Sequence, residues 1–185
     1  MFRKELINRF LFTLIWLVVV TLLRLPAGNW GWYLILFWLG AGFGTLLIDL
    51  DHWFYVLVTF PQEGTSIVVR KFLKERRWRE ATQILSQNAQ ERIKLPFRNA
   101  PFQIFFTIFC FWVLTSTASW FGKGMAMAML LQLLREEIVL LLKGRDEFLC
   151  QRLFWLLQKS PTLKQQKFFV ILMLLFFLGL NLLLI

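Results

Sequence analysis

Two short clusters of ionisable side chains interrupt otherwise apolar stretches of this 185-residue chain. Both clusters are rich in carboxylates, and their members are Asp49, Asp51, His52, Arg135, Glu136 and Glu137. Burying a charge in an apolar environment is costly, so groups of this kind usually pair with one another or mark a functional site. One histidine with two or three carboxylates from facing helices has the composition of a site for a divalent metal ion.

Helical periodicity predicts which of these side chains share a face. Asp49 and His52 are three residues apart and lie on one face of a helix, whereas Asp51 points elsewhere unless the helix breaks there. In the second cluster, Arg135 and Glu136 lie close to one face. Both clusters fall in the same half of their apolar stretches, so the two sets of side chains could meet.

If the clusters form a catalytic site, the chemistry would be hydrolysis assisted by a metal ion. Asp49, His52 and Glu136 would hold a Mg, Mn or Zn ion, which lowers the pKa of a bound water so that it attacks as hydroxide. The other members would be Asp51 or Glu137 as the base and Arg135 as the contact to a phosphate group.

A purely structural interpretation uses the same residues. Arg135 would pair with Asp49 or Asp51 and tie two helices together. Glu136 and Glu137 would then extend toward the membrane surface. A third interpretation is a pathway for ions or protons, which also requires ionisable groups inside the apolar region.

The composition places these clusters in a membrane protein. Hydrophobic residues make up 58% of the chain and charged residues 17%, against about 25% charged residues in an average soluble domain. These values exclude an ordinary soluble enzyme, a disordered chain and a coiled-coil fibre. The two cysteines, Cys110 and Cys150, are too few for a disulfide scaffold, and the single histidine excludes sites that need two.

Five apolar stretches could cross a bilayer core of about 30 Å, which takes about 20 helical residues. The predicted spans are 10–26, 31–60, 101–121, 125–142 and 168–185. The second span is either one long helix or a shorter span followed by a helix in the interface. We therefore expect an all-α integral membrane protein, a bundle of about five transmembrane helices with two basic amphipathic segments.

Basic residues predict the orientation of this bundle. Three precede the first span, nine lie in residues 61–100 and six lie in residues 143–167, while the other two connectors hold only Lys123. Because cytoplasmic loops are enriched in Lys and Arg, we expect a cell-membrane protein with its N-terminus in the cytoplasm and its C-terminus outside. Residues 1–25 also resemble a signal peptide, but no small-x-small cleavage site follows the apolar run, which favours a retained membrane helix.

The two basic segments also predict partners. Residues 61–100 and 143–167 mix apolar and basic side chains at helical spacing, which is typical of helices that lie against anionic lipid headgroups. A cytoplasmic protein is the alternative partner. No nucleic-acid-binding motif accompanies the charge, so we do not expect a nucleic acid partner.

A pair of glycines in the second span predicts close helix packing. Gly40 and Gly44 have the GxxxG spacing that lets two helix backbones approach closely. The contact could lie within the bundle, or it could join two copies of the chain in a homodimer.

The stretch 45–52 reads TLLIDLDH. Its D-x-D-H motif, formed by Asp49, Asp51 and His52, resembles that of membrane-bound metal-dependent hydrolases related to the LexA-binding inner-membrane hydrolases. This resemblance implies a hydrolase that acts on phosphate esters or lipids. The further histidines of that family have no counterpart here, so Glu136 and Glu137 would supply the missing ligands. In its general build, the chain is also similar to short multi-pass membrane proteins of bacteria.

Two functions are therefore expected to compete. The first is a metal-dependent hydrolase with its site in the cytoplasmic half of the bilayer. The alternative is a non-enzymatic membrane scaffold or interaction protein, in which the buried charges pair helices and the basic segments bind anionic lipid or a cytoplasmic partner. The two differ in what the carboxylates contact, a metal ion in the first and basic side chains in the second.

Overall fold

A computed structural model describes residues 2–24, 31–87, 92–116, 118–157 and 161–184. Within these ranges the chain forms helices and connecting loops, with no strand. The helices are α1 (Phe2–Arg24), α2 (Tyr33–Leu47), α3 (Leu50–Phe54), the π-helix η2 (Tyr55–Thr59), α4 (Gly64–Lys74), α5 (Trp78–Gln87), the 3₁₀-helix η3 (Pro96–Arg98), α6 (Ala100–Ser116), α7 (Trp120–Leu142), α8 (Asp146–Phe154) and α9 (Leu163–Leu182). The expected all-helical class is confirmed.

Apolar helices occupy all five of the stretches predicted to cross a membrane. Among the described residues, three are long and apolar enough to do so: Glu5–Arg24, Tyr33–Thr59 and Leu163–Leu182. Helix α6 is equally apolar in character but has 17 residues, and the 23-residue α7 carries the second ionisable cluster in its C-terminal half. The outer limits of the first and last predicted spans, and parts of both basic segments, lie outside the described residues.

Helices α2 and α7 pack with their backbones in direct contact. A methyl group added to Gly40 would collide with the carbonyl oxygen of Phe121, and one added to Gly44 would collide with that of Met125. The glycine spacing of α2 therefore serves a contact within the chain. This face of α2 is covered by α7, so a second copy could use it only after α7 had moved away.

Polar side chains join three helices in the middle of this packing. The Thr13 hydroxyl in α1 lies 2.9 Å from that of Thr45 in α2, and the Gln132 side chain in α7 donates to Thr13 Oγ1 at 2.8 Å. All three side chains are buried. Because buried polar groups must be hydrogen-bonded, this triad fixes the relative rotation of α1, α2 and α7.

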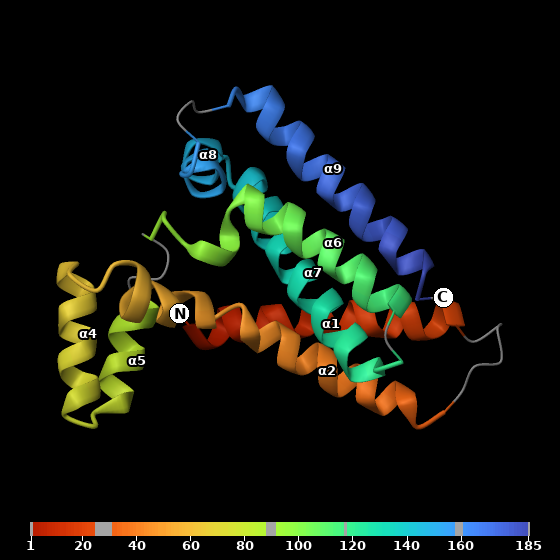
Figure 1. The fold of residues 1–185 in the computed structure, drawn as a ribbon, viewed down its shortest axis with the longest axis horizontal. Coiled ribbons are helices and arrows are strands. Elements are labelled where there is room, and N and C mark those ends of the chain that lie inside the picture. The colour runs from red at the N-terminus through yellow and green to blue at the C-terminus, as the bar shows by residue number, and fades with distance from the viewer. Residues whose placement is uncertain (1, 25–30, 88–91, 117, 158–160, 185) are drawn as a thin grey trace.

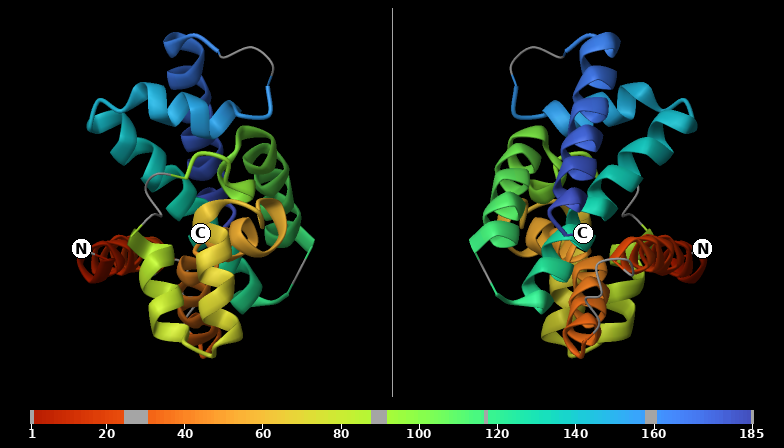
Figure 2. Two further views of the ribbon diagram at one scale, coloured as in Figure 1. Left: turned by 90° about the vertical axis from the view of Figure 1, so that its left-hand side faces the viewer. Right: turned by 90° about the vertical axis from the view of Figure 1, so that its right-hand side faces the viewer.

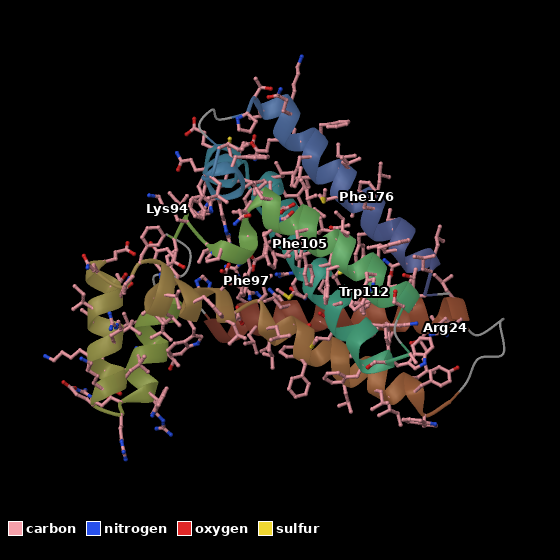
Figure 3. The ribbon with its side chains drawn as sticks, in the orientation of Figure 1. Arg24, Lys94, Phe97, Phe105, Trp112 and Phe176 are labelled. Atoms are coloured by element: carbon pink, nitrogen blue, oxygen red, sulfur yellow. The ribbon has the colours of Figure 1, made fainter. Side chains whose placement is uncertain are left out.

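The remaining long helices cover one side of this three-helix unit (Figure 1). Trp16 in α1 donates its indole N–H to Asn181 in α9 at 2.8 Å, which joins α1 to the C-terminal end of α9. Large apolar side chains of α6 and α9 point away from the protein, among them Phe105, Trp112 and Phe176 (Figure 3). Such exposed apolar faces suit a lipid environment.

Helices α4 and α5 form a hairpin that stands apart from the long helices (Figure 1), and the two helices lie side by side (Figure 2). The hairpin has a small hydrophobic core of its own. Residues of η2 and of the loop that precedes η3 also belong to this core. The buried members of this core are Tyr55, Val56, Val69, Ala81, Leu85 and Leu95. The hairpin is therefore packed against the end of the second apolar helix.

Candidate functional site: an arginine–carboxylate network

The two ionisable clusters do come together, but arginine side chains lie between them. We call this set the arginine–carboxylate network; its members are Arg9, Asp49, Asp51, Arg98, Glu136 and Arg152, with His52 at its edge. Each guanidinium comes from a different segment, α1, η3 or α8. Three cations thus face three carboxylates at one end of the long helices.

Glu136 in α7 is the central acceptor of the network. Its Oε1 accepts from Arg98 Nη2 at 3.0 Å and lies 2.9 Å from Arg9 Nη2 in an ion pair. Its Oε2 accepts from Arg152 Nη2 at 2.9 Å. Side-chain exposure is 13% for Glu136 and 10% or less for the three arginines. In such surroundings an unpaired charge would be costly, so these contacts hold the three segments against α7.

Arg9 lies in α1, which begins two turns before the predicted span. Its Nη1 donates to Asp49 Oδ1 at 2.5 Å, while its Nη2 also lies 3.2 Å from Glu5 one turn earlier. Arg9 therefore bridges Asp49 and Glu136, the two carboxylates that were expected to share a metal ion. The cation between them offsets their mutual repulsion.

Asp51 and His52 enter the network because the second apolar helix tightens locally. The amide of Asp49 donates to Leu46, that of Asp51 to Ile48 and that of His52 to Asp49, which are bonds of the 3₁₀ type. Because of this change of winding, Asp51 is completely buried beside the buried His52. In a regular α-helix it would point to another face than Asp49 and His52. The regular helix is thus interrupted between Leu47 and Leu50. Such a break is what we expected Asp51 to need in order to join the other two side chains.

Arg98 lies close to both Asp51 and His52. Asp51 Oδ1 accepts from the backbone N–H of Phe97 at 3.0 Å, and Asp51 Oδ2 lies 3.9 Å from Arg98 Nε. Arg98 Nη1 lies 3.0 Å from His52 Nε2. Because a guanidinium can only donate, His52 Nε2 must accept, which places the proton of the ring on Nδ1.

Glu137 lies beside the network without an arginine partner among the described residues. Gln103 in α6 donates to one of its carboxylate oxygens, and no described residue bonds the other. A cavity of about 10 Å³ adjoins this pair and is also lined by Arg98 and Arg152. That volume is at the lower limit of what one water molecule needs.

Arg135 does not take the structural role expected for it. Its guanidinium lies over the ring of Phe12 at 6.0 Å, and within the described ranges no ion pair joins it to Asp49 or Asp51. Those carboxylates pair instead with Arg9 and Arg98, and Arg135 is half-buried.

The sequence did not predict Arg9, Arg98 and Arg152 as site residues. They belong to the basic residues from which the orientation of the chain in the membrane is predicted. Burial lowers the pKa of the Arg152 guanidinium to about 10, so it stays charged at neutral pH. One signal was available in the sequence. Carboxylates inside apolar stretches require cations, and Arg135 alone could not balance them all.

The contacts that the carboxylates and His52 already make decide whether a divalent metal ion fits. Guanidinium groups already occupy Asp49 Oδ1, both oxygens of Glu136 and His52 Nε2. Three nearby cations would also repel a divalent ion. Across the described residues, no group of three or more His, Cys, Asp or Glu side chains is placed to hold one. As arranged, these side chains do not fit a metal ion, and the metal site stays a prediction.

Comparison with known proteins does not connect the chain to a family. Neither a protein-family model nor a curated protein nor a solved structure gives a significant match. The likeness of Asp49, Asp51 and His52 to a hydrolase motif therefore remains an expectation from sequence. Any function must be inferred from the side-chain contacts themselves.

Proposed function

We propose that this chain is a non-enzymatic membrane scaffold that holds its basic α4–α5 hairpin against anionic lipid of the cytoplasmic leaflet. The observation that carries this proposal is the bonding of Glu136 to Arg9, Arg98 and Arg152. A carboxylate with three guanidinium partners is suited to joining segments and poorly suited to binding a metal ion or acting as a base.

The network connects the basic segments to the apolar helices. Arg98 lies where the chain returns from the hairpin, and Arg152 lies in α8, within the second basic segment. Through Glu136 both segments are bonded to α7. In a scaffold, the buried charges would therefore hold the hairpin and α8 in a fixed position relative to the membrane helices.

The proposal includes a five-span topology with the network end in the cytoplasm. Contacts at one end join Arg9, Asp49 and Glu136, and contacts at the other join Arg24, Tyr33 and Trp120. Helix α1 therefore runs from the network end to the Arg24 end, and α2 and α7 both run back toward the network end through the same layer. The hairpin and α8 both lie at the Glu136 end, where the sequence concentrates its Lys and Arg residues.

The surface of the hairpin has the chemistry of a lipid-binding helix pair. Ile67, Val68 and Trp78 are exposed apolar side chains. The same hairpin carries exposed basic residues, namely Arg70, Lys71, Lys74, Arg76, Arg77 and Arg79. Apolar side chains that enter the headgroup region, flanked by cations that attract anionic lipid, are typical of helices in a membrane interface.

Hydrogen–deuterium exchange of the full chain in lipid nanodiscs would test the proposal. We expect the amides of α4 to exchange more slowly in discs that contain phosphatidylglycerol than in discs of pure phosphatidylcholine. Replacement of Arg70, Lys71 and Lys74 by Gln should remove the difference, as should about 1 M salt, which shortens the screening length to about 3 Å. Replacement of the exposed Lys143, Lys164 and Lys167 by Gln is the matched control. Equal exchange of α4 in both kinds of disc would overturn the proposal.

A further inference from the structure

The end of the long helices opposite the network contains a second, differently built cationic site. The Arg24 guanidinium, at the end of α1, lies 4.3 Å from the centre of the Trp120 ring and 5.7 Å from that of Tyr33. The two rings stack at 4.9 Å. Tyr33 and Trp120 are the first residues of α2 and α7, so Arg24 lies where one helix ends and two begin (Figure 3).

Among the described residues, this site has cations but no carboxylate side chain that pairs with them. Lys123 Nζ lies 4.9 Å from the same Trp120 ring. In the sequence, no Asp or Glu occurs between Glu5 and Asp49 or between Glu91 and Glu136. The contrast with the network is direct, since each arginine there has a carboxylate partner.

Two of the three guanidinium nitrogens of Arg24 also have no hydrogen-bond acceptor among the described residues. The residue is 6% exposed, and its Nε and Nη1 have no partner among the described residues. A buried donor without an acceptor costs about 1–3 kcal/mol, and more when it is charged. The starts of α2 and α7 add the positive ends of two helix dipoles. Each of these features favours an anion at this position.

An apolar groove begins beside the cationic site. Its volume is about 680 Å³, and it runs between α1 and α2 from Thr21 and Leu34 to Phe10 and Leu46. Thr21 is one turn before Arg24, and Leu34 follows Tyr33. From Leu34 to Leu46 a helix rises roughly 18 Å, close to half of a bilayer core of about 30 Å. The groove therefore has the length of one acyl chain in one leaflet.

We propose that this site binds one anionic phospholipid from the leaflet at the Arg24 end. The phosphate would lie against Arg24 and Lys123, and one acyl chain would lie in the groove between α1 and α2. Two uncompensated cations favour a headgroup with net negative charge over a zwitterionic one. The proposal does not depend on lipid binding by the hairpin, since the two sites use different residues at opposite ends of the protein.

The test is thermal unfolding of the detergent-solubilised full chain, titrated with phosphatidylglycerol, phosphatidylcholine or inorganic phosphate. We expect phosphatidylglycerol to raise the Tm, because a ligand that binds the folded state stabilises it. In Arg24→Gln/Lys123→Gln the apparent affinity should fall about tenfold or more. The matched control is Arg70→Gln/Lys71→Gln on the hairpin, which removes the same charge and should retain the high-affinity response.

A second variant tests the groove without touching the cations. A Cβ at Gly42 would meet no atom within 4 Å, so Gly42→Phe can fill the groove at little cost to folding. We expect this variant to keep its Tm without lipid and to lose most of its response to phosphatidylglycerol. It also keeps the proposal testable if loss of Arg24 disturbs folding.

Three results would overturn the proposal. An unchanged response of both variants to phosphatidylglycerol would show that Arg24 serves aromatic packing alone. An equal response of the wild-type chain to inorganic phosphate would assign the site to a soluble anion. An equal response to phosphatidylcholine would likewise exclude selection of a negative headgroup.

Discussion

Glu136 and Arg98 are 38 positions apart in the chain, yet Oε1 of the first lies 3.0 Å from Nη2 of the second. Between them the chain leaves η3, passes along α6 and returns along α7. This ion pair therefore closes a loop of two apolar helices at a single point. Because Arg98 also contacts His52, the same guanidinium joins the second apolar helix to the fourth.

Loss of the central carboxylate should be more damaging than loss of any exposed acid. Glu136→Gln keeps the shape of the side chain but leaves Arg9, Arg98 and Arg152 without their shared charge. Removing one partner of a buried ion pair typically costs about 3–5 kcal/mol. Thermal unfolding in detergent should show the loss, with exposed Glu147→Gln as the control. Equal Tm values for the two variants would contradict a central role for Glu136.

The sequence predicted the helical class and the positions of the apolar helices because these depend on local composition. It also identified the carboxylates, since a charge inside an apolar run is visible without a structure. Their partners could not be predicted, because Arg9 and Glu136 are joined across most of the chain and no local spacing reports such a contact. The tightened winding at Asp49 could not be predicted from the sequence either, because it depends on the contacts that Asp49, Asp51 and His52 make with other segments.

Metal analysis of the purified protein separates the two functions expected from sequence. If the carboxylates are occupied by arginines, the wild-type chain should hold no stoichiometric Mg, Mn or Zn after loading and desalting. Inductively coupled plasma mass spectrometry gives the metal content, and Asp49→Asn is the comparison. About one metal ion per chain that disappears in Asp49→Asn would reinstate the metal site and contradict the scaffold proposal.

The glycine contact between α2 and α7 makes opposite predictions for two neighbouring positions. Gly44→Ala places a methyl group against the backbone of α7 and should cost about 1–3 kcal/mol, as overpacking usually does. Gly42→Ala meets open space, so it should leave stability unchanged or slightly raised by the better helix propensity of alanine. Thermal unfolding compares the two variants. An unaltered Tm for Gly44→Ala, with a loss of dimer in light scattering, would instead assign this glycine to a homodimer.

Cysteine labelling can decide whether α6 and α7 cross the membrane. In a background of Cys110→Ala and Cys150→Ser, Ala118→Cys lies in the exposed connector between the two helices. If all five apolar helices span, a membrane-impermeant maleimide should label residue 118 in intact cells. If only the three most apolar helices span, residue 118 stays on the same side as the hairpin and is protected. The labelling pattern therefore distinguishes five spans from three.

Two control positions fix the orientation in the same experiment. Trp32→Cys, exposed at the start of α2, should be labelled in intact cells, whereas Lys74→Cys in the hairpin should be labelled only after permeabilisation. Labelling of Lys74→Cys in intact cells would place the basic hairpin outside. That result would overturn the proposed contact with the cytoplasmic leaflet, because the enrichment of Lys and Arg on which the orientation depends would then lie on the wrong side.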